Sequence, residues 1–163
     1  MRLFLSCIIC LALFCSELIM ASPTRSNEVS KVQRQVIVEG SVFGIFGDLS
    51  SKSPSFTPTF EVPLVENQNY GWIIKIRSSL PKVKWREELS LPAVPETWGL
   101  SDKQENRTLT NDGRTLITER EVELENGLIT NVWSVASGDP KGQYIIRVFI
   151  DGEVVGVFRF ELK

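Results

Sequence analysis

The amino-acid sequence predicts an all-β domain, either a β-sandwich or a barrel, and two patterns carry that prediction. Short segments rich in β-branched and aromatic residues recur from Gln35 onward, and Gly, Pro, Asn, Asp or Ser residues separate them. None of these segments has apolar residues recurring every three and four positions, as an amphipathic helix requires. Eight strands are therefore expected, at residues 36–46, 59–66, 70–78, 82–91, 114–124, 128–135, 143–150 and 153–162.

The N-terminus has the layout of a secretory signal peptide. Arg2 precedes an apolar run from Leu3 to Phe14, and the segment ends in the small residue Ala21. The run is shorter than the roughly 20 residues that span a bilayer, so an uncleaved anchor is the less favoured alternative. We expect export to the periplasm or beyond, with membrane contact only through the export signal. The expected organisation is a signal peptide at 1–21, a flexible leader at 22–34 and a β-sandwich domain at 35–163.

Composition excludes most familiar catalytic chemistries. The chain has no histidine, and Cys7, Cys10 and Cys15 all lie in the predicted signal peptide. Ser-His-Asp systems, His-ligated metal sites and thiolate chemistry are therefore excluded. The net charge of −2 gives no electrostatic case for binding nucleic acid. We predict no catalytic residue, no metal ligand and no cofactor.

Carboxylate chemistry is the enzymatic alternative that remains. A glycosidase needs two carboxylates about 5 to 10 Å apart across a cleft, one of them with a raised pKa. Glu119, Glu121 and Glu123 alternate on one expected strand opposite Leu116 and Val122, as a solvated face does. Other carboxylates flank the long loop 92–106, namely Glu87, Glu88, Asp102 and Glu105.

A row of cations is the first candidate binding surface. Lys75 and Arg77 share a face on one expected strand, and Lys82, Lys84 and Arg86 share a face on the next. If the two strands pair, five cations gather on one exposed face, suited to an anionic glycan, a lipid head group or an envelope protein. The alternative is a face whose cations pair with the acidic row of another strand.

The tryptophans supply the second candidate. Trp98 lies in the loop 92–106 between prolines and a glycine, and we predict it as an exposed ligand contact. The alternative is that it caps an open end of the fold. Trp72 and Trp85 share a face with apolar neighbours and are expected in the core.

The last two expected strands form a hairpin around Asp151-Gly152. A two-residue turn would pair Ile150 with Glu153 and would put the apolar rows of the two strands on opposite faces. We therefore predict a three-residue loop with Gly152 in the left-handed conformation, which returns Val148 and Phe158 to one face.

Three segments resemble a family of small exported bacterial proteins classed as a domain of unknown function. They are TFEVPLVENQNYGWIIKIR (59–77), TNDGRTLITEREVE (110–123) and NVWSVASGDPKGQYIIRVFIDGEVVGVFRFEL (131–162). The shared features are a Val-Pro step before a Gly-aromatic strand, a late Trp before an Asp-Pro-x-Gly turn, and a terminal Asp-Gly hairpin. The resemblance implies an immunoglobulin-like antiparallel β-sandwich of about seven to nine strands in the cell envelope. It carries over no catalytic residues.

These observations predict an exported, non-catalytic binding or accessory module of the cell envelope. Its ligand is not specified by the sequence. The first alternative is a carboxylate-dependent hydrolase acting on envelope sugars. The second is a protease inhibitor that inserts the loop 92–106 into its target.

Overall fold

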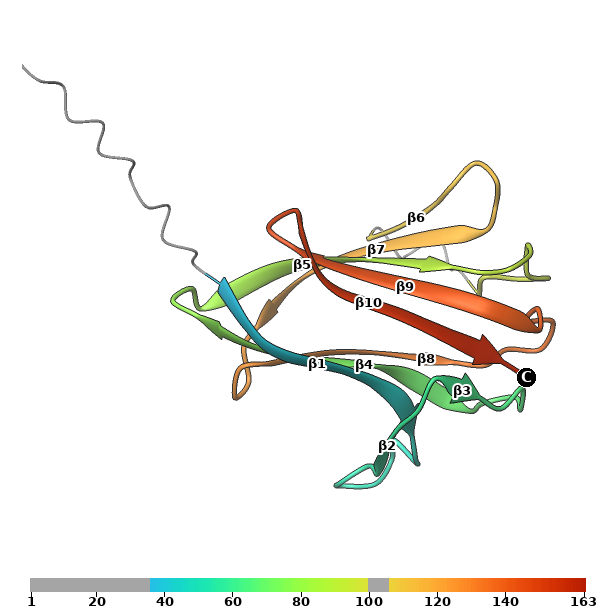
Figure 1. Ribbon diagram of the computed structural model, residues 1–163, viewed down its shortest axis with the longest axis horizontal. Coiled ribbons are helices and arrows are strands. Elements are labelled where there is room, and N and C mark those ends of the chain that lie inside the picture. Colours follow the sequence, from blue (N-terminus) through green and yellow to red (C-terminus); the bar gives the residue numbers. More distant parts are fainter. Residues whose placement is uncertain (1–35, 100–105) are drawn as a thin grey trace, which may run out of the picture. The chain divides into compact units, whose positions relative to one another are not determined.

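The computed structural model describes residues 36–99 and 106–163, which form two β-sheets packed face to face (Figure 1). The four-stranded sheet has the order β2-β1-β4-β8, with β1 (Val36–Phe46), β2 (Phe56–Pro58), β4 (Asn69–Ser78) and β8 (Leu128–Ser134). The six-stranded sheet has the order β3-β10-β9-β5-β7-β6. Its strands are β3 (Glu61–Val62), β5 (Lys82–Ser90), β6 (Arg107–Leu109), β7 (Thr115–Glu123), β9 (Gly142–Ile150) and β10 (Glu153–Leu162).

The all-β prediction is confirmed, and the fold is a sandwich rather than a barrel. Every strand pair is antiparallel except the short pair of β3 with β10, which is parallel. The described residues contain no helix long and apolar enough to cross a membrane. The predicted signal peptide 1–21 and leader 22–34 lie outside the described residues and stay predictions.

The core follows from strict alternation along the long strands. Val83, Trp85, Glu87 and Leu89 of β5 are buried, whereas the residues between them are more exposed. Burying each large apolar side chain contributes about 1.5 to 3 kcal/mol, which fixes the face that each strand turns inward. The predicted core tryptophans are confirmed: the Trp72 and Trp85 rings meet edge to face at 5.4 Å.

The predicted three-residue loop of the last hairpin is wrong. Ile150 pairs directly with Glu153, so Asp151 and Gly152 form a two-residue loop, with φ of 51° and 79°. Two positive φ values are typical of a type I′ turn, whose twist matches that of the strands. The pairing shifts by one residue after Val154, because Phe149 pairs with Val154 but Val148 pairs with Gly156.

Val155 is thus the extra residue of a β-bulge. The bulge returns Ile146 and Phe158 to the same buried face, as the apolar pattern requires, while Val154 stays 53% exposed. The apolar pattern therefore predicted the buried face of β9 and of β10 from Gly156 onward, but it wrongly placed Val154 on that face, because the offset lies at Val155 and not in the turn.

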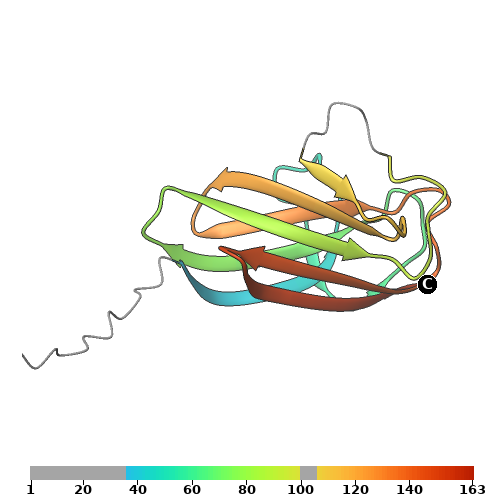
Figure 2. The same cartoon turned by 90° about the horizontal axis from the view of Figure 1, so that it is seen from above.

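The loops divide between two ends of the sandwich (Figures 1 and 2). One end carries the β8–β9 connection, the segment that follows β5, and the C-terminus. The β9–β10 turn and the start of β1 lie at the opposite end.

Candidate functional site

The five predicted cations do not form one row, because β4 and β5 do not pair. β4 belongs to the four-stranded sheet and β5 to the six-stranded sheet, so the three residues between them cross from one sheet to the other. On β4, the Lys75 ammonium lies 3.2 Å from a Glu39 carboxylate oxygen and the Arg77 guanidinium lies 2.9 Å from the other. The carboxylate of Glu39, on β1, therefore neutralises part of the charge of these two cations.

The cations of β5 face the acidic row of β7. Lys82 pairs in register with Glu123, Lys84 with Glu121 and Arg86 with Glu119. The Lys82 ammonium lies 3.5 Å from Glu123 Oε1, and Arg86 Nε lies 3.8 Å from Glu119 Oε1. The alternative of cross-strand charge pairing is the one that the structure adopts here.

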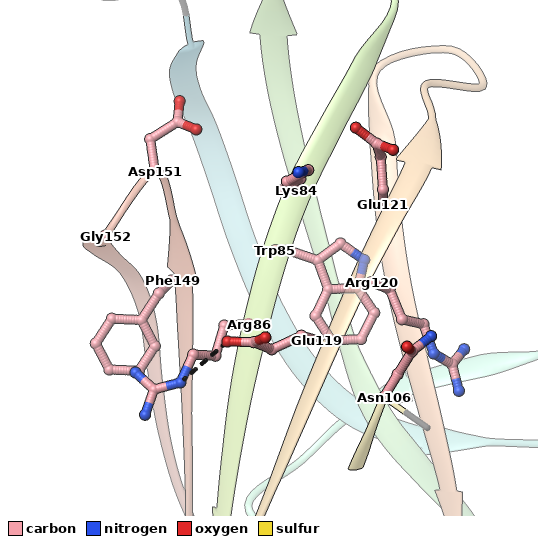
Figure 3. Close-up of a pocket in the computed structure, with 10 residues that line it drawn as sticks. All are labelled: Lys84, Trp85, Arg86, Asn106, Glu119, Arg120, Glu121, Phe149, Asp151 and Gly152. Carbon is pink, nitrogen blue, oxygen red and sulfur yellow. Dashed lines mark ion pairs between the residues drawn. The ribbon is translucent and has the colours of Figure 1, made fainter. Parts of the chain in front are cut away.

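A shallow hollow of about 670 Å³ lies where this charged ladder meets β9 (Figure 3). The Arg86 guanidinium lies 5.1 Å from the centre of the Phe149 ring, which covers one face of that aromatic side chain. The hollow is electrically balanced, because its lining includes three cations, Lys84, Arg86 and Arg120, and three carboxylates, Glu119, Glu121 and Asp151. It therefore gives no preference for an anionic ligand.

A second pocket, which we call the end pocket, lies at the end of the sandwich that carries the β8–β9 connection. It has a volume of about 220 Å³ and takes lining residues from both sheets and from the segment after β5. Its aromatic residues are Tyr70 of β4, Trp98, Trp133 of β8 and Tyr144 of β9. Asp139 is its carboxylate.

Local hydrogen bonds hold the end pocket in shape. Trp98 Nε1 donates to the carbonyl oxygen of Gly113 at 2.9 Å, which ties the segment after β5 to the turn between β6 and β7. The Tyr144 hydroxyl donates to the Pro140 carbonyl at 2.8 Å. The backbone N–H of Ala136 donates to Asp139 Oδ2 at 2.8 Å. Trp98 is half-buried against the core, so it caps the sandwich and also lines the pocket.

The Asp139 carboxylate is partly withdrawn from water. Burial raises the pKa of Asp139 above its ordinary value, and the hydrogen bond from Ala136 opposes that rise. Coulombic repulsion from Asp139 also contributes to raising the pKa values of Tyr70 and Tyr144, after burial as the main cause. The carboxylate and the two phenols are therefore electrostatically coupled.

A second carboxylate, Glu87, lies in the core between the sheets. It is fully buried on β5 and accepts hydrogen bonds from Trp72 Nε1, from Trp133 Nε1 at 2.8 Å and from Asn131 Nδ2 at 3.1 Å. Burial raises the pKa of Glu87, and its three N–H donors oppose that rise without cancelling it. Trp133 thus connects the end pocket with Glu87, because Trp133 lines the pocket and its Nε1–H donates to the Glu87 carboxylate.

The sequence interpretation missed most of this site. Glu87 was considered only as a flank of the long loop, although its parity with Val83 and Leu89 signals a buried position. Asn131 carries the same signal beside Ile129 on β8. Asp102 and Glu105 lie outside the described residues. Among the described residues, no group of three or more acidic side chains is arranged to hold a metal ion.

Comparison with known protein families identifies the family of this chain. The family model described as PM0630 beta sandwich domain matches residues 41–163. This chain belongs to that family. No curated protein matches its sequence.

Two solved structures illustrate what a PM0630 beta sandwich domain is similar to. An immunoglobulin-like protein from Pseudomonas aeruginosa matches with a TM-score of 0.54 and 18% identity, covering 81% of this chain and 99% of the other. The alkylpurine DNA glycosylase AlkC of Pseudomonas fluorescens, bound to DNA containing an abasic site analog, matches with a TM-score of 0.40 and 16% identity. That match covers 79% of this chain and 30% of the glycosylase. The first likeness confirms the predicted immunoglobulin-like sandwich, and the second is too weak to bear on function.

Proposed function

We propose that this PM0630 domain is a non-catalytic binding module of the cell envelope that holds its ligand in the end pocket. The observation that carries the proposal is the composition of that pocket. Trp98, Trp133, Tyr70 and Tyr144 line it from both sheets and from the segment after β5, with the two tryptophans half-buried and the two tyrosines fully buried. Aromatic side chains with a few polar groups in a concave site are typical of small-molecule binding.

The distribution of carboxylates favours binding over hydrolysis. Asp139 is the single carboxylate among the described residues that line the end pocket. Glu87, the other carboxyl group whose pKa burial raises, is fully buried in the core. A hydrolase acting through two carboxylates needs both of them at the substrate. Within residues 36–99 and 106–163, the hydrolase alternative therefore lacks a second carboxylate beside Asp139.

The envelope location rests on the N-terminal sequence, in which Arg2 and an apolar run precede Ala21. Expression of the whole chain with a C-terminal reporter, followed by cell fractionation, tests it. Cleaved protein in the periplasm or medium supports the proposal. Full-length protein in the cytosol contradicts it.

Ligand binding can be tested by titrating the protein with small sugars, amines, carboxylates and neutral alcohols. Tryptophan fluorescence and calorimetry would measure the binding of each compound. We expect at least one class to bind, and Trp98→Ala to weaken that binding while Phe149→Ala leaves it unchanged. Phe149 is a suitable control because it lines the hollow on the outer face of the six-stranded sheet rather than the end pocket. Equal effects of both variants, or turnover of a glycan by the purified protein, would contradict the proposal.

A further inference from the structure

We propose that the end pocket is selective for a quaternary ammonium group, such as the trimethylammonium head group of choline. This inference deepens the proposed function and rests on it, because it names the ligand class of the same pocket. Three features of the pocket carry it: its charge, its aromatic walls and its size.

The charge of the pocket favours a cation. Asp139 is the one charged residue among the described lining residues, and no lysine or arginine accompanies it there. The contrast with the hollow of Figure 3 is direct, since cations and carboxylates balance in that hollow. A partly buried carboxylate attracts a positive ligand more strongly than an exposed one, because water screens it less.

The aromatic residues that line the pocket supply a second attraction for a cation. The negative face of an aromatic ring attracts a cation, most strongly for tryptophan, and cages of such rings are a recurring means of holding quaternary ammonium groups. Trp98 and Trp133 are the half-buried rings of the pocket, whereas Tyr70 and Tyr144 are fully buried and pack against Phe160, so the two tryptophans supply the accessible ring surface. One face of Trp133 already holds a cation, because the Arg107 guanidinium lies 5.0 Å from its ring centre, so a ligand would meet the Trp98 ring and the remaining surface of Trp133. Arg107 is not among the lining residues.

The size of the pocket selects a head group rather than a whole ligand. Its volume of about 220 Å³ corresponds to roughly seven water molecules. Sites for drug-sized ligands have volumes of about 300 to 1,000 Å³. An oligosaccharide would therefore extend beyond the end pocket, whereas a trimethylammonium group with its short chain fits within it.

The scarcity of acceptors separates a quaternary ammonium from a primary one. A primary ammonium carries three N–H donors that need acceptors. Asp139 is the single carboxylate of the described lining, and its Oδ2 already accepts from Ala136. Of the two lining hydroxyl groups, Thr97 Oγ1 already accepts from the Gly99 N–H and Ser134 Oγ donates to Asn69 Oδ1. A quaternary ammonium needs no hydrogen bond and gains instead from ring faces and from the nearby negative charge.

Calorimetric titration of the whole protein with three probes tests the inference. The probes are choline, its neutral analogue 3,3-dimethylbutan-1-ol, in which carbon replaces the charged nitrogen, and ethanolamine, which is a primary ammonium. We expect choline to bind about tenfold more tightly than either of the other two. Because burial raises the pKa of Asp139, choline affinity should also rise with pH as this carboxyl group ionises.

Asp139→Asn and Asp151→Asn form a matched pair of variants. Both substitutions keep the size of the side chain, and an asparagine can still accept from the Ala136 N–H through its carbonyl oxygen. Asp151 lies in the β9–β10 turn at the opposite end of the sandwich (Figure 1), where asparagine suits a positive φ. We expect Asp139→Asn to abolish the preference for choline over the neutral analogue and to remove its pH dependence. Asp151→Asn should change neither.

The failure of this inference differs from the failure of the proposed function. Equal affinity for choline and the neutral analogue, with both weakened by Trp98→Ala, overturns the selectivity for a cation and leaves a binding module. A stronger response to ethanolamine overturns the quaternary class in the same way. If none of these probes and no member of the wider panel binds, the inference and the proposed function both fail.

Discussion

Glu87 connects the two sheets at the centre of the sandwich. It belongs to β5, and its three hydrogen-bond donors, Trp72, Asn131 and Trp133, belong to the opposite sheet. A buried carboxylate is costly to desolvate, and removing one partner leaves an unsatisfied group. Arg120 contributes a further Coulombic attraction that favours the ionised form of Glu87. The protonation of Glu87 therefore makes the stability of the core depend on pH.

Stability should fall as pH rises through the titration of Glu87. Because burial raises the folded pKa of Glu87 above the ordinary 4.5, its contribution is fully present below pH 4.5 and is lost as pH rises through the folded pKa. The slope for one proton is at most about 1.4 kcal/mol per pH unit. Urea unfolding at several pH values should show this slope in the native protein. Glu87→Gln should flatten it, and an unchanged slope in that variant would contradict the assignment.

Trp72 and Trp85 form a matched pair for measuring the hydrogen bond to Glu87. Both indoles are buried, but Trp72 Nε1 donates to Glu87 whereas Trp85 Nε1 has no hydrogen-bond partner. Trp72→Phe should therefore cost about 1 to 3 kcal/mol more in unfolding free energy than Trp85→Phe. Chemical unfolding of both variants measures the difference. Equal losses would show that the indole N–H adds nothing beyond ring packing.

At the scale of the strands, alternation of apolar residues predicted the seven long strands to within one residue at each end, whereas the strand expected at 59–66 is only the two-residue β3. β1 and β10 have the predicted bounds, and β4, β5, β7, β8 and β9 differ at their ends by one residue at most. The sequence did not predict β2 or β6, because strands of three residues are too short to show a period. Alternation also identifies the buried face of a strand without identifying its sheet, so the separation of β4 from β5 could not be predicted.

The bulge at Val155 should matter more than the turn before it. Deleting Val155 would turn Phe158, Phe160 and Leu162 away from the core, at about 1.5 to 3 kcal/mol for each side chain. We expect that variant not to fold, as judged by circular dichroism and thermal melting. Gly152→Ala keeps the register and strains one positive φ, so it should cost only about 1 kcal/mol. A folded deletion variant with native stability would refute the role given to the bulge.

At the scale of the whole molecule, the end pocket could not be predicted from local patterns. Its residues come from β4, β5, β8, β9 and the segments between them, which only the packing of the two sheets brings together. Trp98 was the one member that the sequence singled out, because a loop tryptophan flanked by prolines stands apart from any period. The sequence places Asp139 in an Asp-Pro-x-Gly turn, and its partial burial depends on neighbours distant in sequence.

The sandwich should fold without the predicted signal peptide and leader. β1 begins at Val36, and the family match begins at residue 41, so the chain from Gln35 onward contains every strand that the structure describes. We expect a protein of residues 35–163 to melt at the same temperature as one of residues 22–163. A melting temperature lower by about 5 °C or more would show that the leader contributes to stability.

The first strand begins at Val36, at the end of the sandwich opposite the end pocket. β1 begins at the end of the sandwich that carries the β9–β10 turn, whereas the opposite end carries the C-terminus (Figures 1 and 2) and the β8–β9 connection, from which the end pocket takes Ala136 and Asp139. A tether attached on the N-terminal side would therefore lie at the end away from the pocket, whereas a bulky fusion after Lys163 would lie at the same end as the pocket. Immobilisation for ligand screening should accordingly be made through the N-terminal side.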